Sequence, residues 1–291
     1  MRKYWSFYWP LALTGIGLVL SMQFQNATLA RYPEAVKELA VLALAYGVYG
    51  FFIAGLQFIS QLANVYARSA HALRKIRNFV WMTGGVISLP LGLVAITPLG
   101  RDMVILIFGI SPSLAQEVSV YLILKCPLIM LNSHRHMATG LLIQAHLTGW
   151  VTLSNFIYMG VVVAALLTGF AFRLAPPIVI VGSEILGVVV LLVVLNFLRA
   201  RHYHLPAQPE HQEVTYRELI KFFIPVSMTG IMFALSRPIL YAFVARTPMS
   251  LPVIAALRVT FDFTMLFQQA ANQFRHFFIS FGFDDLKRKK Q

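Results

Sequence analysis

Residues 222–246 read FFIPVSMTGIMFALSRPILYAFVAR, and they repeat residues 7–31, FYWPLALTGIGLVLSMQFQNATLAR, at a shift of 215 residues. Ten of the 25 positions are identical without a gap, including a proline, a Thr-Gly pair and a terminal arginine. The two stretches therefore begin two homologous units. The largest difference lies inside the segment, where Met22 of the first copy corresponds to Arg237 of the second. A charge within an apolar span is costly in lipid and marks a candidate functional site.

The composition predicts an all-α, polytopic transmembrane helix bundle. Of the residues, 58% are apolar and 12% are charged, whereas about a quarter are charged in a soluble domain. Apolar runs of about 20 residues cross a bilayer as helices, and these runs are too long for barrel strands. A turn is predicted at residues 145–150, where Gly149 can stop a helix. The eight predicted spans are residues 7–30, 39–65, 79–97, 112–143, 151–172, 177–198, 222–245 and 251–281.

The basic residues predict the orientation of the chain. If the N-terminus is cytoplasmic, fourteen Lys and Arg residues fall in inside segments, including the run at 287–290, and five fall in outside loops. This bias follows the positive-inside rule, so we expect an integral protein of the plasma (inner) membrane with both termini in the cytoplasm. The net charge of +13 is then a topology signal and attracts anionic lipid. Nucleic acid is not an expected partner.

The fourth span carries an unusual set of basic residues. Lys125 and His136 share one helical face, whereas Arg135 points elsewhere. The neighbouring His134 and His136 could bind a metal, but no Asp, Glu or Cys lies at a useful spacing on this helix. We therefore expect no metal and no cofactor, and predict that these residues contact an anion, another helix or lipid phosphates.

Two other spans contain charges that need a partner. Glu184 of the sixth span is either paired with a basic residue of the fourth span or serves as a titrating proton or cation site. Arg237 precedes Pro238, which removes a backbone hydrogen bond and kinks the helix. Such a break marks the substrate site in many transporters; the alternative is a structural kink with Arg237 paired to a carboxylate.

The eighth span shows the clearest periodic pattern, a polar face about five turns long with Arg275 beside it. Lipid cannot accept such a face, so it must line a protein interior or a water-filled path. Arg258 and Asp262 are four residues apart and can pair. We expect this face to oppose a small-residue face of the second span, from Ala43 to Gln61. The residues of the polar face, at spacings of four and three, are Arg258, Asp262, Met265, Gln269, Asn272 and His276.

The amides of the first span allow two interpretations. Gln25 and Asn26 lie near its outer end, so they are either interfacial groups or part of a polar cavity lining.

Four motifs resemble the progressive ankylosis family, a branch of the MATE-like multidrug/oligosaccharidyl-lipid/polysaccharide exporter superfamily. They are YWPL at 8–11, AVKE at 35–38, AHLTGW at 145–150, and SRPI at 236–239 with FVAR at 243–246. The resemblance runs from about Tyr4 to Lys290. It implies two lobes of six helices around a central cavity, alternating access by rocking of the lobes, and export of anions such as pyrophosphate, ATP or citrate.

The resemblance and the repeat together predict the division of the chain. We expect a first lobe over residues 1–199, a cytoplasmic linker over 200–217 and the first two helices of a second lobe over 218–291. The family pattern has twelve helices and this chain has eight. We therefore expect a fragment of a longer protein or a short form that needs a second chain to supply four helices.

The leading functional hypothesis is an exporter of small organic or phosphate anions. Arg237, Arg258 and Arg275, with Lys125 or Arg135, would coordinate the anion, and Asp262 and Glu184 would hold these bases or carry a coupling proton. The full set of candidate substrate-binding residues is Arg237, Arg258, Asp262, Gln269, Asn272, Arg275, His276, Lys125, Arg135 and Glu184.

The sequence allows two alternatives to an anion exporter. A flippase of lipid-linked oligosaccharide or a cationic-drug antiporter would keep the fold, although a drug site should hold more acid than base. A membrane fragment or subunit without transport activity is the third possibility. An enzyme is not expected, because no paired carboxylates, nucleophile–base set, phosphate loop or metal cluster occurs at catalytic spacing.

Overall fold

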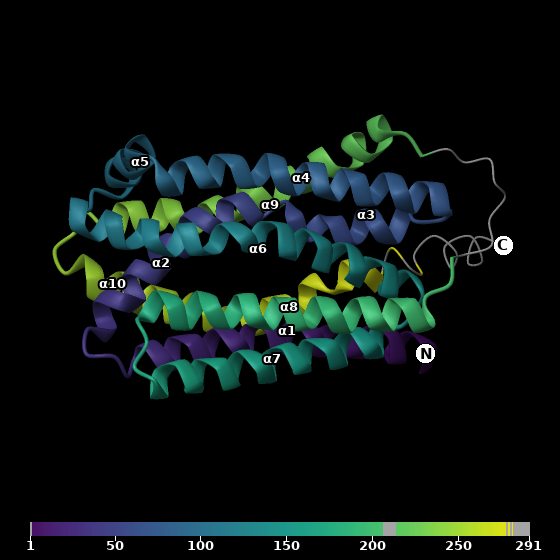
Figure 1. The fold of residues 1–291 in the computed structure, drawn as a ribbon, viewed down its shortest axis with the longest axis horizontal. Helices are drawn as coiled ribbons and strands as arrows, with labels where there is room; N and C mark the ends of the chain where they lie inside the picture. The colour runs from purple at the N-terminus through teal and green to yellow at the C-terminus, as the bar shows by residue number, and fades with distance from the viewer. Residues whose placement is uncertain (1, 206–213, 278, 280, 282–291) are drawn as a thin grey trace.

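The computed structural model describes residues 2–205, 214–277, 279 and 281, and within these ranges the chain is helical with no strand (Figure 1). Residues 206–213 of the predicted linker and the basic run at 287–290 lie outside the described residues. The helices are α1 (Arg2–Leu29), α2 (Ala35–Ile53), the 3₁₀ turn η1 (Leu56–Phe58), α3 (Ile59–Tyr66), α4 (Ala70–Ile96), α5 (Pro98–Phe108), α6 (Pro112–Gln144), α7 (Thr148–Ala171), α8 (Pro176–His202), α9 (Tyr216–Val244) and α10 (Ser250–Asn272).

Among the described residues, eight helices are long and apolar enough to cross a membrane. They are α1, α2, α4, α6, α7, α8, α9 and α10. This confirms the predicted all-α transmembrane bundle, and the protein is an integral membrane protein. Helix α5 has 11 residues, which is too short to span a bilayer core of about 30 Å.

The sequence repeat is also a structural repeat. Helix α1 ends at Leu29 and α9 ends at Val244, while α2 begins at Ala35 and α10 begins at Ser250. Both pairs of boundaries differ by the same 215 positions as the identical residues. The chain therefore builds the same helix, turn and helix twice.

The second span is not the single helix that we predicted for residues 39–65. Helix α2 ends at Ile53, and the chain continues through η1 into α3. At this break α9 approaches closely, because a Cβ on Gly230 would lie 2.8 Å from the carbonyl oxygen of Ala54. The hydroxyl of Ser227, also on α9, donates to the carbonyl oxygen of Gly55 at 3.5 Å. The break thus coincides with a contact between helices far apart in the sequence.

The prediction that Gly149 stops a helix is wrong. Helix α6 ends at Gln144, and the chain turns through His146, which has a φ of 58°. The amide of Leu147 donates to the carbonyl oxygen of Leu142 at 2.9 Å, so the last carbonyls of α6 are already satisfied. Gly149 lies in the first turn of α7.

Helices of the second unit pack against those of the first. Helix α10 lies against α1 and α2, and α9 lies against α2. Helix α6 lies along the middle of the bundle in Figure 1 and packs on α3, α4 and α8. This arrangement turns the charged faces of α9 and α10 toward the first unit.

Candidate functional site

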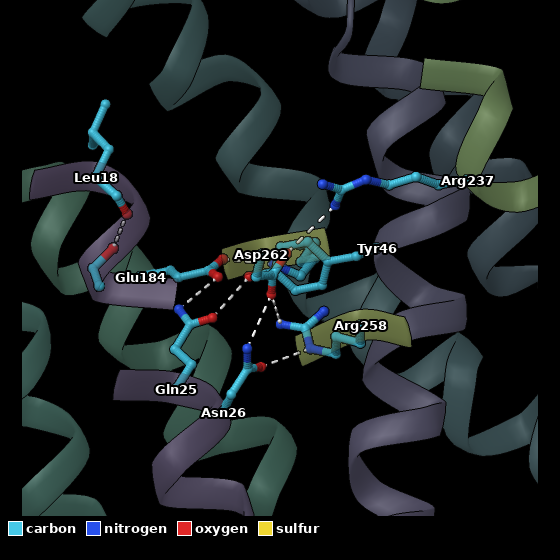
Figure 2. Close-up of polar contacts among 10 residues, drawn as sticks. Leu18, Gln25, Asn26, Tyr46, Glu184, Arg237, Arg258 and Asp262 are labelled. Atoms are coloured by element: carbon cyan, nitrogen blue, oxygen red, sulfur yellow. Dashed lines mark hydrogen bonds and ion pairs between the residues drawn. The ribbon is translucent and has the colours of Figure 1, made fainter. Parts of the chain in front are cut away.

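Asp262 of α10 is the centre of a buried polar network. Its Oδ1 lies 3.4 Å from Nη1 of Arg237 on α9, and its Oδ2 lies 3.6 Å from Nη2 of Arg258, one turn earlier on α10. The amide of Asn26 on α1 donates to the same Oδ2 at 3.1 Å. Figure 2 shows these side chains converging on the carboxylate from three helices. The predicted pairing of Arg258 with Asp262 is confirmed.

Glu184 of α8 forms the second carboxylate centre. Nζ of Lys125 on α6 lies 2.6 Å from its Oε2, which confirms the predicted pairing with the fourth span. The amide of Gln25 donates to Oε1 at 2.8 Å. The hydroxyl of Tyr46 on α2 donates to the amide oxygen of Gln25 at 3.2 Å, so both α1 and α2 are joined to this pair (Figure 2).

The Tyr46 ring connects the two carboxylate centres. Nζ of Lys125 lies 3.8 Å from the ring centroid, and Cζ of Arg258 lies 4.6 Å from it. The Nε of Arg258 also donates to the amide oxygen of Asn26 at 2.8 Å. We call the combined set the central network; its members are Gln25, Asn26, Tyr46, Lys125, Glu184, Arg237, Arg258 and Asp262.

The central network holds more positive than negative charge. Its three basic side chains face two acidic ones, Glu184 and Asp262. Nη2 of Arg258 is buried and has no hydrogen-bond partner among the described residues. The Arg237 side chain is 24% exposed, whereas those of Arg258 and Asp262 are 2% and 1% exposed. The network is therefore a buried, cationic group of side chains, of which Arg237 is partly exposed.

A second group of basic side chains lies farther along α6 and beyond the end of α10. We call Arg135, His136, Arg275 and His276 the basic cluster. Nη2 of Arg135 lies 3.3 Å from Nε2 of His136. Arg275 and His276 lie close enough to His136 to act on it electrostatically. Nη2 of Arg275 donates to Oε1 of Gln57 in η1 at 3.5 Å, so the break in the second span positions this arginine.

Eight of the ten predicted site residues belong to these two groups, and Gln269 and Asn272 belong to neither. Lys125 and His136 share a helical face, as predicted, but they lie eleven residues apart, or about 16 Å along the helix, and belong to different groups. Arg135, which was expected to point away from that face, reaches His136. Gln269 packs against α1, because a Cβ on Gly15 would lie 2.9 Å from its Cβ. Asn272 is the last residue of α10 and is half-buried.

Gln25, Asn26 and Tyr46 are the network members that the candidate set left out. Gln25 and Asn26 are 1% and 4% exposed, so they are not interfacial groups. The two amides could have been found from the sequence, because polar side chains within an apolar span are unusual. Tyr46 could not, because tyrosine is common in many helical environments.

Helix α9 continues through Pro238, so a kink at this proline does not divide the helix in two. Arg237 forms the ion pair with a carboxylate that the second interpretation predicted. Beside Pro238 lies a pocket of about 520 Å³ between α2, α4, α5 and α9, with an apolar lining. Arg246 at this pocket donates to the carbonyl oxygens of Leu106 and Ala242. The pocket suits apolar groups and is separate from the central network.

No group of three His, Cys, Asp or Glu side chains within the described part of the chain is arranged to hold a metal ion.

The fold is shared with solved transporters of known architecture. The MATE multidrug transporter DinF-BH aligns with a TM-score of 0.70 and 13% identity over 96% of this chain and 66% of its own. The eukaryotic MATE transporter AtDTX14 aligns with a TM-score of 0.66 and 12% identity over 96% of this chain and 65% of its own. The chain thus has a MATE-like fold and spans about two thirds of the length of these proteins.

A family model described as "Progressive ankylosis protein (ANKH)" matches residues 1–270, which is nearly the whole chain. The match agrees with the motifs at both copies of the repeat and with the MATE-like architecture. The chain therefore belongs to the progressive ankylosis protein family.

Proposed function

We propose that this protein exports small organic or phosphate anions, of the pyrophosphate, nucleotide or citrate type, by alternating access. The observation that supports this function best is the excess of positive charge in the central network. Burying an uncompensated cation is expensive, and an anion bound beside Arg237 and Arg258 would balance it.

The geometry around Arg237 and Arg258 fits anion binding. Arg237 uses Nη1 for Asp262 and is partly exposed, so the rest of its guanidinium can face an anion. Nη2 of Arg258 is a second donor without a hydrogen-bond partner in the described residues. A guanidinium can hold a carboxylate or phosphate with two parallel hydrogen bonds. An anion at this place would compete with Asp262 for both arginines.

This competition suggests how binding is coupled to movement. Asp262 and Arg258 of α10 contact Asn26 of α1, so the central network joins the second unit to the first. An anion that draws the arginines away from Asp262 would weaken this joint. The helices could then separate, as alternating access requires. Asp262 and Glu184 would hold the basic side chains in place between cycles or carry a coupling proton.

The proposal includes the orientation of the chain in the membrane and the assembly of a complete transporter. We place both termini in the cytoplasm of a plasma (inner) membrane, with residues 1–199 as the first lobe, 200–217 as the linker and 218–291 as the start of the second lobe. Four further helices would come from a longer chain or from a second chain. The lipid bilayer and the anion are then the other partners.

Transport of a cationic drug is the alternative that the comparison with a multidrug transporter brings up. The charge of the central network opposes it, because a cationic cargo would meet three basic side chains and two acidic ones. A flippase of lipid-linked oligosaccharide and a subunit without transport activity remain alternatives within the same fold.

Flux measurements on vesicles containing the purified protein test the proposal. Labelled pyrophosphate, ATP and citrate should each be compared between the unaltered protein and Arg237→Ala. We expect flux of the transported anion to fall at least about tenfold, the effect of roughly 1.4 kcal/mol of lost anion interaction. Arg217→Ala is the matched control, because Arg217 lies on the same helix and is exposed. Unchanged flux in Arg237→Ala would refute the proposal, and protection of cells against cationic dyes would favour the drug alternative.

A further inference from the structure

We infer that the basic cluster of Arg135, His136, Arg275 and His276 is a second anion-binding site, which takes a phosphate or carboxylate group and is separate from the central network. The inference deepens the proposed function and rests on it for one point only, the role of the cluster as a loading site for the exported anion.

The first observation is that the cluster has no counter-charge. The ion pairs of the described residues involve Glu34, Glu117, Glu184 and Asp262, and none of these reaches the cluster. The two arginines are charged at neutral pH, since a guanidinium does not lose its proton in proteins. In the central network, by contrast, each basic side chain lies against a carboxylate. The cluster is therefore the more strongly cationic of the two groups.

The second observation is a set of buried donors and acceptors without partners. Nε of Arg135, Nε of Arg275 and Nδ1 of His276 are all buried and have no hydrogen-bond partner among the described residues. His276 is 2% exposed. A buried polar group without a partner destabilises the fold, so three such atoms among the residues of the cluster indicate a site shaped for a ligand rather than for stability.

The third observation is that the arginines are held in place. Nη2 of Arg275 donates to Gln57, and its Cζ lies 5.0 Å from the centroid of the Phe58 ring. Nη2 of Arg135 lies against His136. These contacts leave the Nε of each arginine free in the described structure. Fixed guanidinium groups of this kind suit the planar or tetrahedral oxygens of carboxylates and phosphates.

The position of the cluster relates it to the central network. Both groups use α6, through Lys125 and Arg135, and both use α10 or the residues just after it, through Asp262 and Arg275. The separations of ten and thirteen residues correspond to about 15–20 Å along a helix. Arg135 lies toward the C-terminal end of α6, and this end of the helix lies at the same end of the bundle as the N-terminus (Figure 1). With that end in the cytoplasm, an exported anion would meet the cluster first.

Equilibrium binding of labelled inorganic pyrophosphate to the full chain in phosphatidylcholine nanodiscs tests the inference. We expect two bound molecules per chain. The double variant Arg135→Gln with Arg275→Gln should lose one of them and keep the other, whereas Arg237→Gln should keep the one that the double variant loses. Equal binding by the unaltered protein and the double variant would overturn the inference, as would the absence of any binding to the unaltered protein.

Stability separates a ligand site from a structural role. Because the cationic groups repel one another, the double variant should unfold at the same or a higher temperature than the unaltered protein without pyrophosphate. A lower unfolding temperature would mean that the cluster holds the fold together, which contradicts the inference. The double variant should also lose the stabilisation that pyrophosphate gives through the cluster.

Two further binding experiments identify which group occupies the basic cluster. The first uses discs that also contain phosphatidylglycerol. If pyrophosphate no longer binds at the cluster in these discs, the cluster is an anion site that takes a lipid headgroup. If binding is unchanged, the cluster takes the free anion. Asp284→Asn with Asp285→Asn tests carboxylates of the chain itself that lie outside the described residues. Unchanged affinity supports the inference, and a rise of about tenfold would show that these carboxylates occupy the cluster.

Transport by the same variants distinguishes the two proposals. If the cluster loads the exporter, the double variant should lose flux at low anion concentration and regain it at high concentration. Binding at the cluster in a chain that transports no anion would contradict the proposed function and leave the anion site standing. Flux that is unchanged at every concentration in the double variant would refute the loading role.

Discussion

Nζ of Lys125 and Oε2 of Glu184 lie 2.6 Å apart, and the two side chains are 0% and 11% exposed. The pair joins α6 to α8 inside the first unit, and Gln25 of α1 donates to the other carboxylate oxygen. Within the membrane interior neither charge has water to replace its partner. The pair is therefore a structural part of the central network as well as a part of its charge balance.

Glu184→Ala should destabilise the protein severely. Removal of one partner from a buried ion pair leaves the other charge unpaired and costs about 3–5 kcal/mol. The double variant Lys125→Met with Glu184→Ala should recover part of this loss, because no charge is then left unpaired. Thermal unfolding in detergent gives the comparison. The explanation fails if the double variant is as unstable as the single variant.

Asn26→Asp should weaken anion transport. Asn26 contacts Arg258 and Asp262, so an aspartate there adds a third acidic group to the network. It also loses the hydrogen bond to Asp262 and repels this carboxylate, so some loss of stability is expected as well. We expect the affinity for the transported anion to fall about tenfold or more, equivalent to at least roughly 1.4 kcal/mol. Asn196→Asp, at an exposed position of α8, is the control for an added charge. Equal flux in the two variants would mean that the net charge of the network does not matter.

Gly140→Ala should disturb the packing of α6 against α3. A Cβ at Gly140 would collide with the backbone carbonyl of Ser60, which cannot move aside as a flexible side chain can. Overpacking of this kind costs about 1–3 kcal/mol. Gly160→Ala on α7 is the matched control, since a Cβ there meets no atom within 4 Å, and the change should be neutral or stabilising by up to about 1 kcal/mol. The unfolding temperature of Gly140→Ala should therefore fall, and that of Gly160→Ala should stay the same or rise.

Tyr203 should make the protein sensitive to alkali. Its hydroxyl donates to Oε1 of Gln144 at 2.8 Å, just beyond the end of α8, and burial raises its pKa from 10.0 to about 12. Below pH 10 the phenol is protonated in the folded and the unfolded chain, so its contribution to stability is complete. Between the two values only the unfolded chain loses the proton, so the free energy of unfolding falls as the pH rises. Tyr203→Phe should show a shallower fall over this range, and an identical pH profile would contradict the assignment.

Much of the fold could be predicted because local composition and repetition carry it. Apolar runs determined the number of spans, and the shift of the repeat also relates the end of α1 to the end of α9 and the start of α2 to the start of α10. The break at Gly55 was not predicted; it lies where Gly230 of α9 approaches, a contact between residues far apart in the sequence. The prediction for Gly149 was wrong, since the turn at His146 had already closed α6.

The sequence by itself determined which polar side chains had to be buried. Arg258, Asp262 and His276 recur with the period of one helix face, and lipid cannot solvate them. The spacing also paired Arg258 with Asp262, but only the tertiary structure decided the partners on other helices, because these depend on how helices from distant parts of the chain cross. Asn26 thus meets Asp262 over a separation of 236 residues, while His276 lies near His136 of α6. The polar face of residues 258–276, which is continuous in the sequence, is thereby divided between the central network and the basic cluster.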